Sequence, residues 1–141
     1  MNQREIVLAG LAPANGASHS PVQVQKLFFL IDRNIPEAID GPLFDFEPYN
    51  YGPFDKNVYD VLERLWMEDL VDINTEYSIR RYKLTVQGQE EGERILATLP
   101  KYAQEYINAV SNFVRSLSFT KLVTAIYKEY PEMRENSVFQ G

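Results

Sequence analysis

The amino-acid sequence predicts an α+β fold that is mainly helical. Residues 54–69 carry apolar side chains at the i, i+4, i+7 spacing of an amphipathic helix. Two short runs at 71–74 and 81–84 then alternate apolar and polar residues, which is the pattern of a β-hairpin. Thr85 follows the hairpin and is suited to cap a further helix. This order of turn, helix, hairpin and helix predicts a winged helix-turn-helix domain with additional C-terminal helices.

Two helices are expected before this region. Residues 3–12 form a short apolar helix that ends in the stretch from Pro13 to Gly16. A second helix has Ser20 as its N-cap and Pro21 at its first position, and it ends near Asn34. The apolar stripe of this second helix consists of Val24, Leu27, Phe28, Leu30 and Ile31.

The segment from 35 to 51 is rich in proline. Within it, Leu43, Phe44 and Phe46 predict a short extended strand, because prolines stand on both sides. Gly52 and Pro53 then predict a tight entry into the amphipathic helix. The core-facing stripe of that helix consists of Phe54, Val58, Val61, Leu62 and Leu65.

Three helices complete the chain. Thr85 caps a helix at roughly 86–98, in which Gly88 and Gly92 are expected to lower local stability. Two more helices follow Pro100 and Ser118. We expect residues 1–141 to form a single winged-helix-like domain, with core and wing at 1–85, C-terminal helices at 86–134, and a frayed tail at 135–141.

Composition narrows the class of protein. Hydrophobic residues make up 45% of the 141 residues and charged residues 24%, as in globular domains. The chain has no cysteine, which excludes disulfides, thiolate nucleophiles and cysteine-ligated zinc. We find no apolar run of membrane-spanning length and no N-terminal basic region followed by an apolar core, so we expect a cytoplasmic protein without a membrane partner.

The sequence carries no recognisable catalytic pattern. His19 is the only histidine, and we expect it at the surface or at a helix cap. Glu90, Glu91 and Glu93 fall in the first turns of a helix, where the helix dipole favours carboxylates. Neither a glycine-rich phosphate loop nor an EF-hand spacing is present. We therefore expect no enzyme activity, no cofactor and no metal site.

Several short motifs, taken in order, resemble a known prokaryotic family. They are the QKLFFL run at 25–30, the Tyr51-Gly52-Pro53-Phe54 turn, Leu84-Thr85 followed by Gly88, and Tyr127 followed by Tyr130-Pro131. Over roughly residues 20–131 the chain resembles the Panacea-type antitoxin domain of the SocA-like proteins, a group of small phage-associated proteins found beside toxins. The resemblance implies an antitoxin-like or regulatory protein-binding module in a toxin–antitoxin or defence context, and it implies no catalytic residues.

The charge distribution bears on whether the chain binds DNA. The net charge is −6, and all of the excess lies in residues 1–70, which hold 5 basic and 11 acidic side chains. Along 54–69 the polar face is mostly acidic, with Asp55, Asp60, Glu63, Glu68 and Asp69 against only Lys56 and Arg64. Phosphates would repel such a helix in the major groove.

The predicted wing is the exception to this acidic character. Arg80, Arg81 and Lys83 form a compact basic group that could contact a phosphate backbone. The same residues could equally be solvated strand residues that pair with Asp72 or Glu76. A DNA-binding winged-helix regulator that uses the wing is therefore the alternative function.

Aromatic residues form the remaining signal. Tyr49, Tyr51, Phe54 and Tyr59 cluster around the 51–54 turn, where they either fill the junction between strand and helix or form a recognition surface with an acidic rim. A later stripe is either core or a homodimer interface, and it comprises Tyr102, Tyr106, Phe113, Tyr127 and Tyr130. The favoured partner is a protein, such as a toxin.

Overall fold

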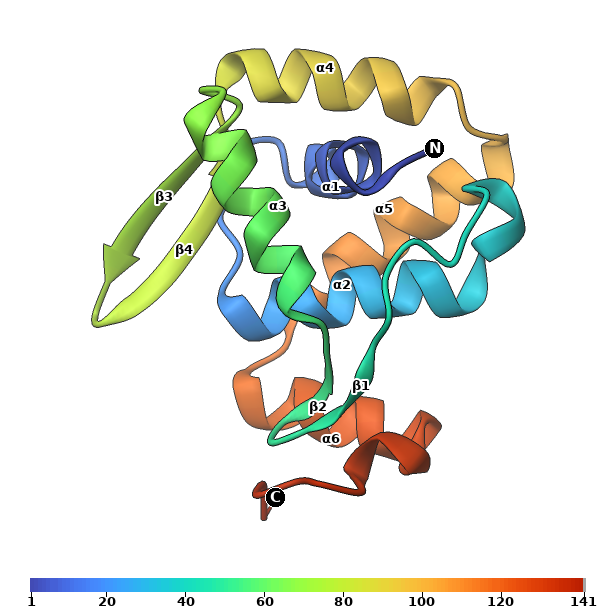
Figure 1. Ribbon diagram of the computed structural model, residues 1–141, viewed down its shortest axis with the longest axis vertical. Helices are drawn as coiled ribbons and strands as arrows, with labels where there is room; N and C mark the ends of the chain where they lie inside the picture. Colours follow the sequence, from blue (N-terminus) through green and yellow to red (C-terminus); the bar gives the residue numbers. More distant parts are fainter. Residues whose placement is uncertain (141) are drawn as a thin grey trace.

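The structure is a computed structural model that describes residues 1–140, and its fold is α+β and mainly helical, as predicted (Figure 1). Within these residues the helices are α1 (Gln3–Leu11), α2 (Pro21–Asn34), α3 (Lys56–Met67), α4 (Val86–Ala97), α5 (Lys101–Ser116) and α6 (Phe119–Glu129). The strands are β1 (Glu47–Tyr49), β2 (Gly52–Phe54), β3 (Val71–Glu76) and β4 (Ile79–Leu84), which form two separate antiparallel hairpins. Short 3-10 helices lie at Ala12–Ala14, Pro36–Ala38 and Pro131–Arg134.

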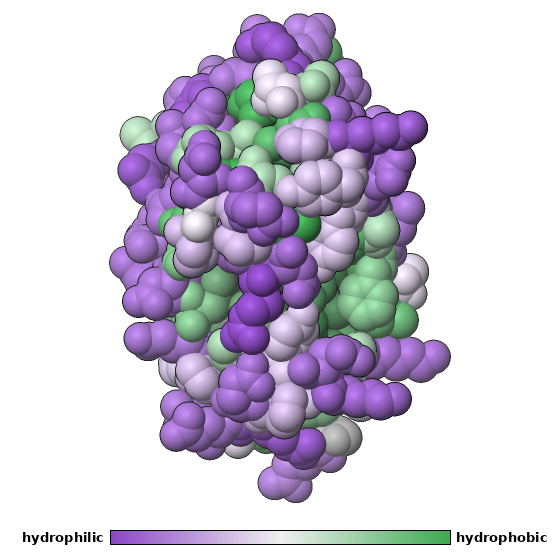
Figure 2. Space-filling view, turned by 90° about the vertical axis from the view of Figure 1, so that its right-hand side faces the viewer, coloured by the Kyte–Doolittle hydropathy of each residue, from purple (hydrophilic) through white to green (hydrophobic). Residues whose placement is uncertain are grey.

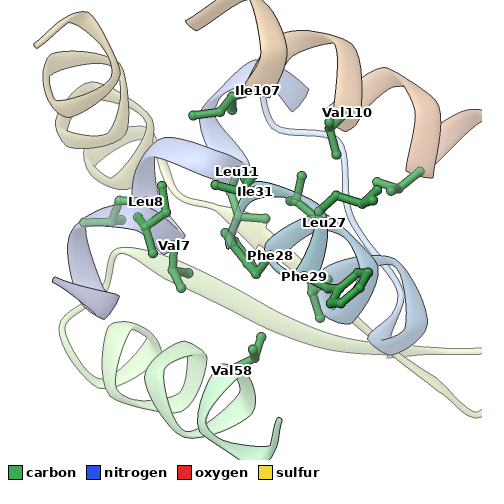
Figure 3. Packing of buried hydrophobic residues seen from close by; sticks show 14 of the residues in the cluster. Val7, Leu8, Leu11, Leu27, Phe28, Phe29, Ile31, Val58, Ile107 and Val110 are labelled. Atoms are coloured by element: carbon green, nitrogen blue, oxygen red, sulfur yellow. The ribbon is translucent and has the colours of Figure 1, made fainter. Parts of the chain in front are cut away.

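Helix α1 lies at the centre of the molecule, between α4 on one side and α2 and α5 on the other (Figure 1). Its residues from Ile6 to Leu11 are all buried, so this part of the helix is apolar all round. Figure 3 shows Leu8 and Leu11 of α1 facing a cluster that α2, α3 and α5 also supply. The buried core cluster extends from Ile6 to Met133, with members from every α-helix except α4 and from both strands of the β3–β4 hairpin.

The predicted helix caps at Ser20, Thr85 and Ser118 are confirmed. Ser20 forms a full capping box with Gln23, and Pro21 begins α2. The hydroxyl of Thr85 accepts from the N–H of Gly88, and that of Ser118 accepts from the N–H of Lys121. These caps satisfy first-turn N–H groups that no residue inside the helix can serve.

The glycines of α4 have a different role from the predicted one. A Cβ atom at Gly88 would overlap the carbonyl oxygen of Leu70, and one at Gly92 would overlap the carbonyl oxygen of Leu8. Both glycines are buried, and Gly92 lies against α1. Because glycine has no side chain, α4 can pack closely against these carbonyl groups. The stabilisation from this packing offsets the low helix propensity of glycine.

The predicted hairpin between α3 and α4 is confirmed. Val71 pairs with Leu84 and Ile73 with Tyr82, and the turn residues Tyr77 and Ser78 both have positive φ. Two such residues in a two-residue loop match the twist of an antiparallel hairpin. The hairpin extends away from the helices, with its turn far from the core (Figure 1).

The predicted strand at Leu43, Phe44 and Phe46 is wrong. The backbone N–H groups of Leu43 and Phe44 donate to the carboxylate of Asp32 on α2, at 2.9 and 2.7 Å. Strand β1 begins only at Glu47, and it pairs with β2 across the turn at Asn50 and Tyr51. The 51–54 motif is therefore largely a strand, and α3 begins after it.

The C-terminal segment packs beside the β1–β2 hairpin. Of the tail predicted to fray, the N–H of Val138 donates to the carbonyl oxygen of Asn50 at 3.0 Å, and the ring of Phe139 lies 6.1 Å from that of Phe119. Gly141 lies outside the described residues. No helix among residues 1–140 is long and apolar enough to cross a membrane.

Candidate functional site

A pocket of about 590 Å³ opens between the β1–β2 hairpin, the N-terminal turn of α2, the start of α6 and strand β4. All four predicted aromatic residues line it, namely Tyr49, Tyr51, Phe54 and Tyr59. Phe119 and Leu122 of α6 and Val22 of α2 complete much of its apolar wall. Its volume lies within the range of about 300–1,000 Å³ typical of ligand pockets.

The aromatic rings of the pocket contact one another in pairs. Tyr49 and Phe54 have ring centroids 4.9 Å apart, and Tyr51 lies edge-on to Phe119 at 5.1 Å. Tyr49 and Tyr51 are nevertheless 51% and 44% exposed. Half-exposed tyrosines beside a pocket have the mixed apolar and polar character of protein recognition surfaces. The other predicted role, filling the junction of strand and helix, applies mainly to Phe54 and Tyr59, which are half-buried.

Buried polar side chains of α2 hold the hairpin in place. Gln25 forms two hydrogen bonds with the backbone of Asp55, donating to its carbonyl oxygen and accepting from its N–H, both at 2.9 Å. Lys26 donates to the carbonyl oxygen of Pro53 at 3.3 Å. Asp32 binds the other end of the connecting loop, at Leu43 and Phe44. Polar side chains of one helix thus fix both the hairpin and the loop that precedes it.

Gly52 supplies the backbone conformation that the β1–β2 turn needs beside α2. Its φ is +101°, a conformation that L-residues other than glycine rarely adopt. A Cβ atom at this position would stand 3.5 Å from Nζ of Lys26 and 3.4 Å from the ring of Tyr127. These are ordinary van der Waals distances, so the positive φ, rather than a lack of space, is what favours glycine here.

Lys26 is the buried charge of the site. It is 3% exposed, and desolvation lowers the pKa of its ammonium group to about 7. Among residues 1–140, no carboxylate forms a salt bridge with it, and its hydrogen bond goes to a neutral carbonyl oxygen. The charged form of this lysine therefore destabilises the folded state without the compensation that an ion pair would give.

The structure does not present the three predicted wing cations as one free patch. Arg81 lies on the pocket wall and donates to the hydroxyl oxygen and the carbonyl oxygen of Ser18, at 3.0 and 3.3 Å. Arg80 points to the other face of β4 and pairs with Glu63 of α3 at 3.3 Å. Lys83 is half-buried near the base of the hairpin.

The expectation that His19 lies at the surface or at a helix cap is wrong. The residue is fully buried, and neither ring nitrogen has a hydrogen-bond partner. Its backbone pairs with that of Tyr82, with N–H to oxygen distances of 2.8 and 2.9 Å. Burial, followed by the charges of Arg115 and Arg81, lowers its pKa to about 4, so the ring is neutral near pH 7. The position directly before the N-cap Ser20 often packs against its helix, which is the signal that could have revealed this burial.

Gln25, Lys26 and Asp32 were not predicted as site residues. Each stands inside the stretch from Val24 to Asp32, every residue of which is buried. Polar residues within a helix segment that is buried all round need specific partners, and this requirement is the signal that sequence reasoning could have used. Among residues 1–140 we find no group of three or more histidine, cysteine or acidic side chains that could hold a metal ion.

Comparison with known proteins finds a family model that covers most of the pocket lining. The family model of the SocA-like antitoxins, the Panacea domain, matches residues 24–131, which include Lys26 and both strands of the β1–β2 hairpin. No curated protein matches the chain significantly. The matched family suggests a non-enzymatic role and implies a protein partner such as a toxin. Because the match covers most of the chain, the resemblance seen in the sequence is confirmed, and the protein belongs to the SocA-like antitoxin family defined by the Panacea domain.

Proposed function

We propose that the protein is a non-catalytic, cytoplasmic antitoxin-like module that binds a protein partner through the pocket beside the β1–β2 hairpin. The observation that carries this proposal is the pocket wall, where half-exposed Tyr49 and Tyr51 stand beside Phe119. Membership of an antitoxin family supports a polypeptide partner. A toxin from a phage or defence context is the partner that this family membership favours.

The proposed framework is a winged helix within one domain. The order of α3, the β3–β4 hairpin and α4 supports this assignment, with the projecting hairpin as the wing (Figure 1). The single buried cluster that joins residues from Ile6 to Met133 supports treating residues 1–141 as one unit. In this framework α5 and α6 are additions, and α6 forms part of the binding pocket.

DNA binding through the wing is the second candidate, as a transcriptional regulator. Projection of the hairpin from the body favours it, because Arg80 and Lys83 lie on this arm (Figure 1). The pairing of Arg80 with Glu63 and the contacts of Arg81 with Ser18 weigh against it, since both guanidinium groups already have partners. Phosphate contact would have to break these interactions.

A homodimer is a further proposal. Much of the aromatic stripe on α5 and α6 is used internally: Tyr127 is buried, and Tyr106 and Tyr130 both accept from Nδ2 of Asn34, at 2.7 and 2.9 Å. Tyr102 and Phe113 are 50% and 39% exposed, so they are the members left for contact with a second copy. Light scattering coupled to size-exclusion chromatography measures the mass directly.

Affinity capture from the native host tests the proposed function. Tagged wild type is compared with Tyr51→Arg, which places a charge at the pocket, and with the control Trp66→Arg, which changes a 53% exposed aromatic side chain of α3 outside the pocket lining. We expect a stoichiometric protein with the wild type and the control, and its loss with Tyr51→Arg. Retention of that protein by Tyr51→Arg would refute binding at the pocket. Duplex DNA that is lost on Arg80→Glu and at raised salt would support the regulator instead.

A further inference from the structure

We propose that the pocket recognises the carboxyl end of a partner polypeptide, with an apolar last side chain among the aromatic rings and the terminal carboxylate at the ammonium group of Lys26. This inference rests on the proposed function, since it names the part of the partner that the pocket receives. It assigns Lys26 a binding role.

The charges of the pocket select an anion. Lys26 and Arg81 line it, and no aspartate or glutamate does, so the acidic rim expected from the sequence does not extend to the pocket lining. This local charge contrasts with the net charge of −6 of the whole chain. A carboxylate that entered the pocket would meet two cations and no like charge.

Two helix N-termini add to the positive electrostatic potential that Lys26 and Arg81 create in the pocket. Ser20 and Pro21 place the start of α2 at the pocket, and Ser118 and Phe119 place the start of α6 there. The caps at Ser20 and Ser118 each bind one first-turn N–H, and the aligned peptide dipoles still give each helix N-terminus a partial positive charge. The dipoles of both helices therefore favour an anion in the space that Lys26 and Arg81 already make positive.

Lys26 has the capacity to bind such an anion. Its ammonium group offers three donors, and the structure gives it one acceptor, the carbonyl oxygen of Pro53. The side chain is 3% exposed and lines the pocket, so an anion that reaches it is itself removed from water. Charge-assisted hydrogen bonds are strongest where water is excluded.

The rest of the pocket selects an apolar side chain close to that carboxylate. Aromatic rings from Tyr49, Tyr51 and Phe119 and the aliphatic chain of Leu122 line the same pocket as Lys26 and Arg81. At a chain end, the last side chain and the carboxylate leave the same Cα atom, so both can enter one pocket. Within an extended chain, neighbouring side chains point to opposite faces, which separates an internal carboxylate from the apolar residue next to it.

The structure itself shows a peptide segment at the edge of this pocket. The N–H of Val138 donates to the carbonyl oxygen of Asn50, a lining residue, at 3.0 Å. Phe139 then packs edge-on against Phe119, another lining residue, with ring centroids 6.1 Å apart. Backbone hydrogen bonding combined with an aromatic contact is the way in which a peptide ligand would approach, and it favours a polypeptide over a small molecule.

Fluorescence anisotropy with labelled hexapeptides tests the proposal on the full chain. The peptides have a glycine–serine leader, leucine and a last residue of phenylalanine, leucine or tryptophan, each made as the free acid and as the C-terminal amide. At pH 6.5 we expect at least one free acid to bind about 10-fold or more tighter than its amide, the ratio expected for one hydrogen bond between charged groups.

One variant and its control test whether Lys26 causes the preference for the free acid over the amide. Lys26→Met keeps the length of the side chain and removes the charge, and we expect it to bind acid and amide about equally. The control Lys128→Met removes an exposed cation from α6 outside the pocket lining and should keep the wild-type ratio. Equal binding of acid and amide by the wild type, or no binding of any free acid, would overturn the proposal.

A further peptide separates the two sources of a carboxylate. It is amidated and carries glutamate directly before its last phenylalanine, so its only carboxylate is a side chain. If it bound as tightly as the free acid, recognition of a chain end would be refuted. The capture experiment and the peptide experiment can fail separately. If Tyr51→Arg abolished capture of the natural partner while the free-acid and amide peptides bound equally, the proposed function would stand and only the recognition of a chain end would be refuted.

Discussion

Lys26 places a buried ammonium group on α2 with one carbonyl oxygen as its hydrogen-bond acceptor. In an unfolded chain a lysine has a pKa near 10.5, and burial lowers it to about 7 here. The unfolded state therefore binds more protons between these two values, and stability falls as the pH falls from 10.5 toward 7. Below pH 7 Lys26 is charged in both states, and burying that charge lowers the free energy of unfolding by its full amount, on the order of a few kcal/mol.

The first prediction follows from this penalty. Lys26→Met should raise the free energy of unfolding by about 2 kcal/mol at pH 7, because it removes an uncompensated buried charge. The advantage should shrink as the pH rises to 10, where the wild-type lysine is neutral in the fold. Two other groups lining the pocket do not change over this range, because burial raises the pKa of Tyr59 to about 12 and Arg81 stays charged. Urea unfolding at both pH values measures the difference, and a variant less stable at pH 7 would contradict the account.

His19 gives a second prediction, in the acid range. Its pKa is about 4 in the fold against 6.5 for the free side chain, so the unfolded state binds more protons between those values. Stability contributed by neutral His19 should therefore fall by up to about 3 kcal/mol as the pH falls from 6.5 to 4. His19→Leu should remove this part of the pH dependence, because Arg81 and Arg115, which face the ring, do not titrate there. Equal acid sensitivity in thermal unfolding of both proteins would refute this assignment.

Helix α2 is the element on which the site depends, because its polar residues fix the loop and hairpin that follow. A third prediction concerns Gln25, whose two hydrogen bonds hold the backbone of Asp55. Gln25→Ala leaves both backbone groups without these partners and should destabilise the protein by about 2 kcal/mol. It should also speed hydrogen exchange at Asp55. Gln104→Ala, which removes a single bond to Leu99, is the control and should leave exchange at Asp55 unchanged.

Helix α4 gives a fourth prediction, on packing. Gly88→Ala forces a Cβ atom onto the carbonyl oxygen of Leu70 and should cost about 2–3 kcal/mol despite the better helix propensity of alanine. The neighbouring Gln87 is exposed, and Gln87→Ala should leave stability unchanged or raise it slightly. A gain in stability for Gly88→Ala in urea unfolding would show that propensity, rather than close packing, governs this position.

Elements with a clear apolar period were predicted well. Helices α2 and α3 and the β3–β4 hairpin were found within one or two residues of their observed bounds, because their patterns and caps are local in the sequence. The first strand was predicted at the wrong residues because a distant side chain sets the conformation there. The carboxylate of Asp32 accepts hydrogen bonds from the N–H groups of Leu43 and Phe44, so these residues do not pair as a strand. Such tertiary hydrogen bonds leave no periodic signal.

The site was predicted only in part, because the sequence reveals residues that are close together along the chain but not those that only the fold brings together. The aromatic cluster at Tyr49, Tyr51, Phe54 and Tyr59 was identified because its members are close in the sequence. Lys26 and Phe119 were missed, since only the fold brings them to the same pocket. Burial of His19 was missed because a polar side chain without a hydrogen-bond partner runs against the usual distribution of residues.

At the scale of the whole molecule, the surface restricts where a partner can bind. On the face seen in Figure 2, hydrophilic residues predominate and hydrophobic ones form separate patches. The acidic balance of the chain favours approach by a basic partner over long distances, whereas the pocket itself carries the cations Lys26 and Arg81. Steering and local recognition would therefore depend on different parts of the surface.

Hydrogen–deuterium exchange of the free protein and of its complex with the captured partner tests the central claim most directly. We predict that the partner protects three of the segments that line the pocket, at residues 20–26, 49–54 and 117–122, while exchange in the β3–β4 turn at Tyr77 and Ser78 is unchanged. Protection confined to the β3–β4 turn, with these three segments unaffected, would contradict the account.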